Sequence, residues 1–360
     1  MTSRERVLTA FARQEPDRVP LDYAANPGID KRLKVHFRLK DGDDEGLLQA
    51  LGTDFRYTYR PNYIGPKLFE DKPGCIVNEW AGYCRWIKHE TGGYWDYCDF
   101  PLKDAALEEI EQWPMPSPDQ YDYTGFAAEC RRLRDYAVVV GGQGIPDIIN
   151  GAGMVRTMEQ TLLDMALEEP AFLRYVERRL NVHLEVLARA LEMVKKDAAV
   201  FYMGEDLGTQ RGPSISLEMY RKLLKPWHKK FVDLARHHGL PVMIHSCGSS
   251  SWAFEDFIEM GIGVIDTLQP EAKDMSPRCL KDTFGDRLAF HGCISTAGPL
   301  ACGTVKDVED NVRETLEIMM PGGGYALAPT HYMQDNTPTE NVVAMYETAR
   351  AFGQYGGKRN

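Results

Sequence analysis

Residues 198–246 read AAVFYMGEDLGTQRGPSISLEMYRKLLKPWHKKFVDLARHHGLPVMIHS, and this stretch decides the fold class. It begins with a short apolar run, continues through a segment of helical period at 216–238, and ends with a second apolar run. Parallel strands need crossover connections of this kind, and burial on both faces makes their sequences continuously apolar. The stretch therefore predicts a strand, a helix and a second, parallel strand.

The same alternation extends in both directions from this stretch. Further apolar runs occur at 136–142, 263–269, 287–292 and 324–330. Helical patterns lie between and after them, at 156–168, 170–195, 251–260, 276–283, 304–319 and 337–352. Because residues 20–135 have room for two more strands, we expect an α/β fold: a single distorted (β/α)8 barrel of the TIM type. A doubly wound open sheet is the alternative.

The N-terminal part of the chain has a different pattern. Residues 3–14 have the spacing of an amphipathic helix, which the two prolines of EPDRVP end. Residues 20–135 are rich in aromatic residues, glycine and proline, and 74–97 reads as an antiparallel hairpin. That hairpin carries Trp80, Trp86 and Trp95. We expect one domain over 1–360, in which 20–135 contains an insertion that covers one end of the barrel.

Composition and charge narrow the class of function. The chain is 43% hydrophobic and 26% charged, which is ordinary for a globular protein. A net charge of −11 disfavours binding to nucleic acid or to an anionic membrane surface. No apolar run approaches the roughly 18 to 20 residues that span a bilayer, and the charged start lacks a signal-peptide core. We expect a cytoplasmic protein with a small-molecule substrate.

Polar side chains follow the apolar runs, at the points where the predicted strands end. The carboxyl ends of barrel strands meet at one mouth, where active sites are built. Loops that only cap helices would supply serine, asparagine and aspartate. Here the residues are Glu205, Asp206, His245, Cys247, Gln269, His291, His331 and Tyr332. We therefore expect residues far apart in the sequence to converge on one functional pocket.

The pair His245 and Cys247 suggests a metal site. The two residues are two positions apart at a strand end and project in the same general direction. Histidine and cysteine are the usual zinc ligands, and a catalytic zinc site has three protein ligands and one open position. His331 and Cys293 are both candidates for the third ligand. The alternative is a buried thiol beside a hydrogen-bonded core histidine.

Glu205 and Asp206 form an adjacent acidic pair, with Arg211 nearby. Neighbouring carboxylates can have their pKa values pushed apart, which gives one acid and one base, or one of them pairs with the arginine. Adjacent side chains of an extended segment face opposite ways. We expect one of the two carboxylates to face the pocket.

Five segments resemble the uroporphyrinogen decarboxylase superfamily: RERVLTAFARQEPDRVP, GEDLGTQRGPSISLEMYRKLLKP, HSCG, LAFHGCIST and GGGYALAPTHYMQDNTPTENVVAMY. The resemblance implies a single distorted (β/α)8 barrel with a cleft at the carboxyl ends of its strands. True decarboxylases of that superfamily carry an M-R-Q-A-G-R-Y segment whose arginines bind the carboxylates of the substrate. This chain has PLDYAANPGIDKRL at the corresponding place, so uroporphyrinogen is not the expected substrate.

The chain is more similar to the zinc-dependent methyltransferases of the superfamily, which work with corrinoid proteins. In that branch a H-x-C pair and a later cysteine bind zinc. His245 and Cys247 match the pair, and GGGYALAPTH places His331 at the later cysteine, which favours His331 over Cys293. One thiolate and two imidazoles leave a net charge of +1 on a Zn²⁺ site. Such a site suits an oxygen ligand better than a thiol.

The resemblance thus implies a zinc-dependent methyltransferase or O-demethylase. It would move a methyl group between a small methoxylated or hydroxylated substrate and a corrinoid protein. Glu205 or Asp206 would supply the fourth ligand or a proton. The substrate would be oriented by Arg211, Gln269, His291 and Tyr332. A homodimer is an option, and the alternative functions are a metal-independent decarboxylase or lyase of another small carboxylated substrate and a non-catalytic binding protein.

Overall fold

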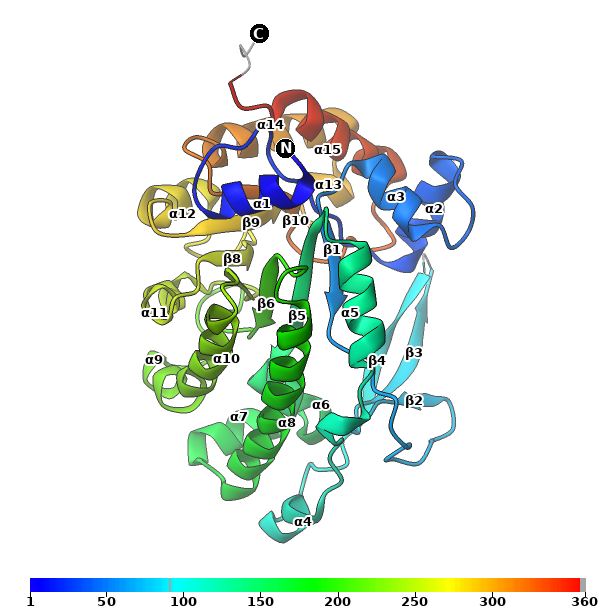
Figure 1. The fold of residues 1–360 in the computed structure, drawn as a ribbon, viewed down its shortest axis with the longest axis vertical. Helices are drawn as coiled ribbons and strands as arrows, with labels where there is room; N and C mark the ends of the chain where they lie inside the picture. The colour runs from blue at the N-terminus through cyan, green and yellow to red at the C-terminus, as the bar shows by residue number, and fades with distance from the viewer. Residues whose placement is uncertain (91, 357–360) are drawn as a thin grey trace.

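The computed structural model describes residues 1–90 and 92–356, and its centre is a curled sheet of seven parallel strands (Figure 1). The strand order is β1-β5-β6-β7-β8-β9-β10. The strands are β1 (Phe55–Tyr59), β5 (Ala137–Pro146), β6 (Val200–Gly204), β7 (Val242–His245), β8 (Val264–Thr267), β9 (Ala289–Ile294) and β10 (Tyr325–Pro329). All six apolar runs predicted as strands are present in consecutive order, which confirms the barrel-type α/β fold.

A short extended segment around Leu21 lies between the first and last strands of this sheet. Leu21 forms a parallel bridge with Leu327 of β10, whose N–H donates to the carbonyl of Pro20 at 2.9 Å. On the other side, the N–H of Asp54 donates to the carbonyl of Leu21 at 2.8 Å, directly before β1. The segment therefore takes the place of the eighth strand and leaves Asp22 at the mouth.

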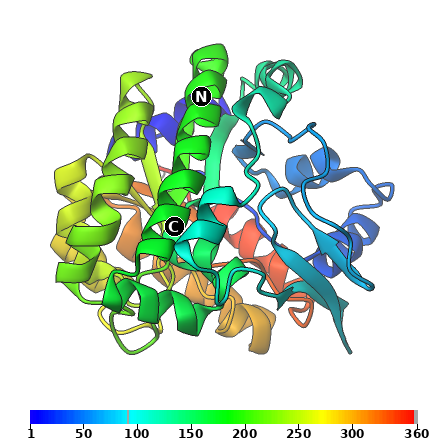
Figure 2. The ribbon, with the colours of Figure 1, turned by 90° about the horizontal axis from the view of Figure 1, so that it is seen from below.

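Helices surround the sheet (Figures 1 and 2). They are α1 (Ser3–Phe11), α2 (Pro27–His36), α3 (Asp44–Leu51), α4 (Leu107–Gln112), α5 (Tyr123–Arg132), α6 (Ile148–Arg156), α7 (Met158–Leu167), α8 (Pro170–Val194), α9 (Leu217–Met219), α10 (Lys225–His237), α11 (Phe254–Met260), α12 (Pro277–Phe284), α13 (Pro299–Cys302), α14 (Val305–Met319) and α15 (Thr339–Phe352). Short turns η1 (Pro118–Gln120), η2 (Tyr220–Leu224) and η3 (Ser251–Ala253) complete the set. Within the described residues, no helix combines the length and the apolar character that a membrane crossing requires.

Two predicted helices differ in detail from the structure. The helix expected over 156–168 is α7, because Thr157 has a φ of 74° that ends α6 and caps α7. The helix expected over 216–238 contains the π-helical turn Tyr220–Leu224. Pro226 follows that turn at the start of α10, where its missing N–H requires no acceptor.

The insertion predicted within 20–135 contains a three-stranded antiparallel sheet. Its strands are β2 (Cys75–Val77), β3 (Tyr83–His89) and β4 (Gly92–Asp99), in the order β2-β3-β4. The predicted hairpin is β3 and β4, where Trp86 lies opposite Trp95 with the two rings edge to face. Figure 2 shows this sheet beside the barrel, on the same side as α2 and α3.

The apolar core has two parts. One part lies between the sheet and the surrounding helices, and the other fills the inside of the barrel. The inner part is made of inward-facing strand residues such as Val139, Val200 and Met243, together with Val7 and Phe11 of α1. Helix α1 therefore closes the barrel at the amino ends of the strands, which leaves the carboxyl ends as the open mouth.

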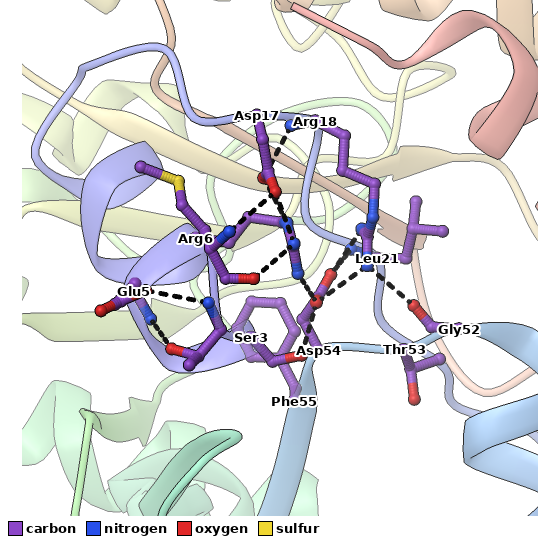
Figure 3. A network of polar contacts seen from close by, with 12 residues as sticks. Ser3, Glu5, Arg6, Asp17, Arg18, Leu21, Gly52, Thr53, Asp54 and Phe55 are labelled. Carbon is purple, nitrogen blue, oxygen red and sulfur yellow. Dashed lines mark hydrogen bonds and ion pairs between the residues drawn. The ribbon is translucent and has the colours of Figure 1, made fainter.

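A buried polar network, the Asp54 network, fastens α1 to the barrel (Figure 3). It consists of Ser3, Arg6, Asp17, Arg18 and Asp54. The Asp54 carboxylate accepts hydrogen bonds from Arg6 at 2.6 Å, Arg18 at 2.8 Å and Ser3 at 2.8 Å. Arg6 also pairs with Asp17 at 2.6 Å. Each charge of the network has an opposite charge beside it, which is the condition for burying ionic groups without a large loss of stability.

Candidate metal centre and active site

Three predicted metal ligands lie together at the mouth of the barrel. His245 ends β7, Cys247 follows two residues later, and His331 follows β10. One ligand atom of each residue lies within 4.8 Å of those of the other two. His245 Nε2 is 3.2 Å from Cys247 Sγ. The other candidate, Cys293, is buried on β9 and is not in this group.

The turn after Cys247 depends on a glycine. Gly248 has a φ of +71°, and a Cβ there would lie 2.5 Å from the carbonyl oxygen of Gly208. Only glycine fits both conditions without a shift of the backbone. The N–H of Gly248 donates to Gln269 Oε1 at 2.6 Å. The predicted residue Gln269 therefore holds the loop that carries the cysteine.

A carboxylate fixes the orientation of His245. Its Nδ1 lies 2.8 Å from Asp266 Oδ2, and Tyr202 donates its hydroxyl to the same oxygen at 2.5 Å. A carboxylate behind a histidine sets the tautomer and leaves Nε2 free for a metal ion. Burial acts to lower the pKa of His245, but Cys247 and Asp266 raise it well above its usual value. The imidazole is thus aimed and polarised by its neighbours.

The predicted residue His291 extends this arrangement across the mouth. Its Nδ1 lies 2.6 Å from Asp266 Oδ1, and its Nε2 lies 3.0 Å from Asp22 Oδ2. Tyr57 donates to the same oxygen of Asp22 at 2.5 Å. Burial acts to lower the pKa of His291, but the two carboxylates raise it to about 9. We name Asp22, His291, Asp266 and His245 the carboxylate–histidine chain.

Asp206 is the member of the acidic pair that reaches the metal ligands. Its Oδ1 accepts the backbone N–H of Cys247 at 2.9 Å and lies 3.7 Å from His245 Nε2. Its Oδ2 accepts from Asn150 Nδ2 at 3.0 Å. Burial acts to raise the pKa of Asp206, but His245 and these hydrogen bonds lower it below its usual value. A carboxylate is therefore present within reach of the three ligands.

Glu205 faces the other way, as expected for adjacent residues of an extended segment. Its carboxylate is buried and accepts the backbone N–H groups of Ile148 and Ile149 at 2.8 and 2.9 Å. His228 Nε2 lies 3.1 Å from it. These contacts place Glu205 at the amino end of α6, where a negative charge is stabilised by the helix dipole.

The remaining predicted residues lie at different distances from the centre. Tyr332 is 37% exposed and lines the mouth. Arg211 lies in an exposed loop, where its backbone N–H donates to Thr209 Oγ1, and it lines neither of the two cavities described next. Of the three hairpin tryptophans, Trp80 lines a cavity, whereas Trp86 and Trp95 are about half exposed.

Two neighbouring cavities lie at the mouth. The smaller one has a volume of about 460 Å³. It is lined by the four residues of the carboxylate–histidine chain and by Tyr57, Tyr202 and His331. The larger one, of about 960 Å³, lies between the insertion and helices α6 and α8. Tyr59, Gln143 and Tyr332 line both. The two cavities therefore adjoin at these three residues.

Sequence patterns alone do not identify three of these residues. Asp22 and Tyr57 lie in the N-terminal part, which has no clear strand pattern, and Gln143 follows a strand in a glycine-rich turn. Asp266, in contrast, is an aspartate inside the apolar run 263–269. A charged residue in a buried strand needs a partner, and that signal was available.

Comparison with known proteins agrees with this architecture. The family model described as uroporphyrinogen decarboxylase (URO-D) matches residues 105–352. A methyltransferase from Methanosarcina mazei has a similar structure, with a TM-score of 0.64 and 17% identity over 98% of this chain and 99% of that chain. A D-psicose 3-epimerase crystallised in the presence of D-fructose gives a TM-score of 0.36 and 12% identity over 68% of this chain and 85% of its own. No curated protein matches the sequence.

Proposed function

The chain belongs to the uroporphyrinogen decarboxylase family, and within it we propose a zinc-dependent methyltransferase or O-demethylase. The enzyme moves a methyl group between a small methoxylated or hydroxylated substrate and a corrinoid protein. The observation that carries this proposal is the group of His245, Cys247 and His331 beside a cavity at the barrel mouth. The likeness to a methyltransferase from Methanosarcina mazei supports it.

The donor set fits zinc. Zinc bonds of about 2.0 to 2.3 Å keep two ligand atoms within about 4.4 Å of each other. The ligand atoms here lie within 4.8 Å, so small side-chain rotations bring all three to one ion. The Nδ1 of His245 already has the carboxylate partner that metal-bound histidines commonly have. Zinc bound there would act as a Lewis acid on an oxygen of the substrate.

The residues around the smaller cavity would stabilise the negative charge that forms in this reaction and supply the proton that neutralises it. When an ether loses its methyl group as a cation to the corrinoid, its oxygen keeps a negative charge and takes up one proton. His291 lies between two carboxylates that raise its pKa to about 9, and the hydroxyl of Tyr57 donates to one of these carboxylates. We assign proton supply to these two groups, and to Asp206 a place as fourth ligand or as a base beside the ligands.

The smaller cavity does not suit uroporphyrinogen. The chain reads PLDYAANPGIDKRL at 20–33, the place that by resemblance corresponds to the arginine segment of the true decarboxylases. No arginine or lysine is among the described residues that line this cavity, whereas four aspartates are. A substrate with eight carboxylates needs cationic partners, and bidentate arginine is the residue suited to bind them. The described lining of the smaller cavity therefore offers such a substrate no arginine or lysine partner.

Metal analysis tests the first half of the proposal. Freshly purified protein is expected to hold about one equivalent of zinc, and Cys247→Ala or His331→Ala to hold less than about a tenth. Cys279→Ala and His36→Ala are matched controls, because both side chains are exposed and lie outside the site. Zinc content that stays unchanged in the two ligand variants would refute the metal centre.

The second half needs a corrinoid protein as methyl acceptor. With a reduced corrinoid protein and a methoxylated substrate, we expect formation of methylcobalt, followed by its absorption spectrum, and loss of that reaction in Cys247→Ala. Release of CO₂ from a carboxylated substrate, unaffected by chelators, would instead identify a metal-independent decarboxylase.

A further inference from the structure

The larger cavity has an excess of positive charge. Arg60, Lys67 and Arg179 line it, and Glu79 is the one carboxylate among the lining residues that the structure describes. Glu79 pairs with Arg60 at 3.2 Å and also accepts the indole N–H of Trp80 at 2.9 Å. Lys67 in turn pairs with Asp71, which leaves Arg179 as the cation to account for.

Arg179 contributes a buried cation that forms no ion pair with a carboxylate of the described residues. It is 7% exposed, and its guanidinium donates to the backbone carbonyls of Pro146, Asp147 and Gly144 at 2.8, 3.1 and 3.3 Å. Carbonyl dipoles satisfy its hydrogen bonds, and the Asp147 carboxyl, whose pKa burial raises well above its usual value, interacts with its charge without forming an ion pair. Burial of an uncompensated charge is unfavourable, so a bound anion would be stabilised here.

Two further polar atoms at this cavity have no hydrogen-bond partner among the described residues. They are Nη1 of Arg60 and Nε2 of His183. His183 is 4% exposed and its ring stacks on Trp80 at 4.3 Å. Burial, with the charges of Arg179 and Arg60, holds the pKa of His183 well below its usual value. A guanidinium nitrogen and an imidazole nitrogen thus lack a hydrogen-bond partner among the described residues of the same wall.

Aromatic side chains give this wall a second property. Besides Trp80, the rings of Tyr59, Tyr63 and Tyr97 line the cavity. Apolar and aromatic walls with a few directed polar groups are typical of sites that bind flat organic ligands. Tyr59 also lines the smaller cavity beside the metal ligands, as do Gln143 and Tyr332. A planar ligand in the larger cavity therefore reaches toward the predicted zinc.

We propose that the larger cavity binds the carboxylate end of the substrate through Arg60, Arg179 and His183, and that the substrate is a methoxylated aromatic carboxylate. This inference rests on the proposed function and names its substrate class. The carboxylate accepts hydrogen bonds from the unpartnered Arg60 and His183 atoms. The ring lies along the aromatic wall, and the methoxyl group lies past Tyr59 and Gln143, at the smaller cavity.

Calorimetric titration with two probes tests the carboxylate site. The probes are 4-methoxybenzoate and the neutral 4-methoxybenzyl alcohol, which share the ring and the methoxyl group. We expect wild type to prefer the acid, and Arg60→Met to bind the acid roughly 10- to 100-fold more weakly while its affinity for the alcohol is unchanged. Arg132→Met is the matched control, because Arg132 is exposed on α5 and pairs only with Glu129.

A variant with the opposite expected effect keeps the test independent of misfolding. Glu79→Gln removes the carboxylate that competes for Arg60, so it should bind 4-methoxybenzoate more tightly than wild type does. Equal affinity of wild type for acid and alcohol would overturn the proposal. So would an acid preference that persists in Arg60→Met and does not rise in Glu79→Gln. Displacement of bound 4-methoxybenzoate by free cobalamin would assign the cavity to the corrinoid and also overturn it.

Titration of the Cys247→Ala protein separates this inference from the proposed function. The carboxylate site does not include the metal ligands, so Cys247→Ala should keep the full preference for 4-methoxybenzoate. Preference without zinc or demethylation would retain the carboxylate site and refute the proposed function. Demethylation that proceeds equally well on acid and alcohol would retain the function and refute the carboxylate site.

Discussion

The two ends of the barrel hold similar charged groups in opposite arrangements. At the amino ends of the strands, Asp54 is fully buried between Arg6 and Arg18, and α1 covers the network. At the carboxyl ends, Asp266 is 9% exposed in its side chain and lies between two histidines that line a cavity. The charges of the Asp54 network, at the amino end, pair with one another. Those at the carboxyl end include side chains that line the smaller cavity.

The choice of cation follows the same division. Arginine keeps its charge at every physiological pH and its planar group binds carboxylates with two hydrogen bonds, which suits a permanent fastening. Histidine can lose its proton or ligate a metal, which suits a site that must change state. In this barrel the amino end carries the Asp54 network and the carboxyl end carries the proposed active site, which matches the division of stability and function that TIM barrels generally show.

Breaking the Asp54 network should produce the largest loss of stability. Asp54→Asn leaves Arg6 and Arg18 without their shared carboxylate, and we expect the free energy of unfolding to fall by about 3 to 5 kcal/mol. Urea denaturation measures this. Asp17→Asn, at a side chain that is 42% exposed, should cost at most about 1 kcal/mol. If the two variants lose equal stability, the amino end is not the fastening that the contacts indicate.

His291 should make the stability of the other end depend on pH. Its folded pKa of about 9 lies above the ordinary 6.5 of the unfolded chain, because Asp22 and Asp266 outweigh the effect of burial. A raised pKa contributes stability that is complete below pH 6.5 and lost as pH rises through about 9. The shift corresponds to about 3 kcal/mol.

The variant His291→Gln isolates that contribution. The difference in unfolding free energy between wild type and His291→Gln should be greatest below pH 6.5 and smaller by about 3 kcal/mol above pH 9. Urea denaturation at several pH values between 6 and 10 measures it. The exposed His36→Gln should show no such trend. A difference that does not change with pH would show that His291 is not a cation in the folded protein.

Asp266 should affect metal binding more than folding. Asp266→Asn removes the carboxylate behind His245, and loss of such a partner typically weakens metal binding 10- to 100-fold. Competition with a chromogenic chelator measures the zinc affinity. Asp256→Asn is the matched control: Asp256 is also buried and paired with cations, Arg221 and Lys225, but lies on α11. Equal zinc affinity in both variants would contradict the role of Asp266.

The fold could be predicted where its physical signal is continuous. Parallel strands buried on both faces give unbroken apolar runs, so the strands from 136 onward are visible in the sequence. The segment at Leu21 could not be found, because a single bridge to Leu327 leaves no periodicity to read. The helix break at Thr157 was equally hidden, since a backbone φ of 74° in a non-glycine residue is set by tertiary contacts.

The sequence predicts those residues of the candidate site that lie at the ends of apolar runs. His245, Cys247 and His331 follow apolar runs, and the family resemblance selected His331 over Cys293. Asp22 lies beyond such reasoning, because it is placed by the short segment that completes the barrel. The sequence does not decide between Glu205 and Asp206. Adjacent side chains of an extended segment face opposite ways, which shows that one of the two faces the mouth but not which one.

Gln269 should have the smallest effect at the mouth. Its side chain accepts the N–H of Gly248, the residue after Cys247, and a neutral hydrogen bond of this kind contributes about 1 kcal/mol. Gln269→Ala should therefore weaken zinc binding about fivefold and leave unfolding of the metal-free protein within about 1 kcal/mol of wild type. The same chelator competition measures this, with the exposed Gln49→Ala as control. A loss as large as that of Asp266→Asn would mean that the Cys247 loop determines zinc affinity as strongly as the carboxylate behind His245 does.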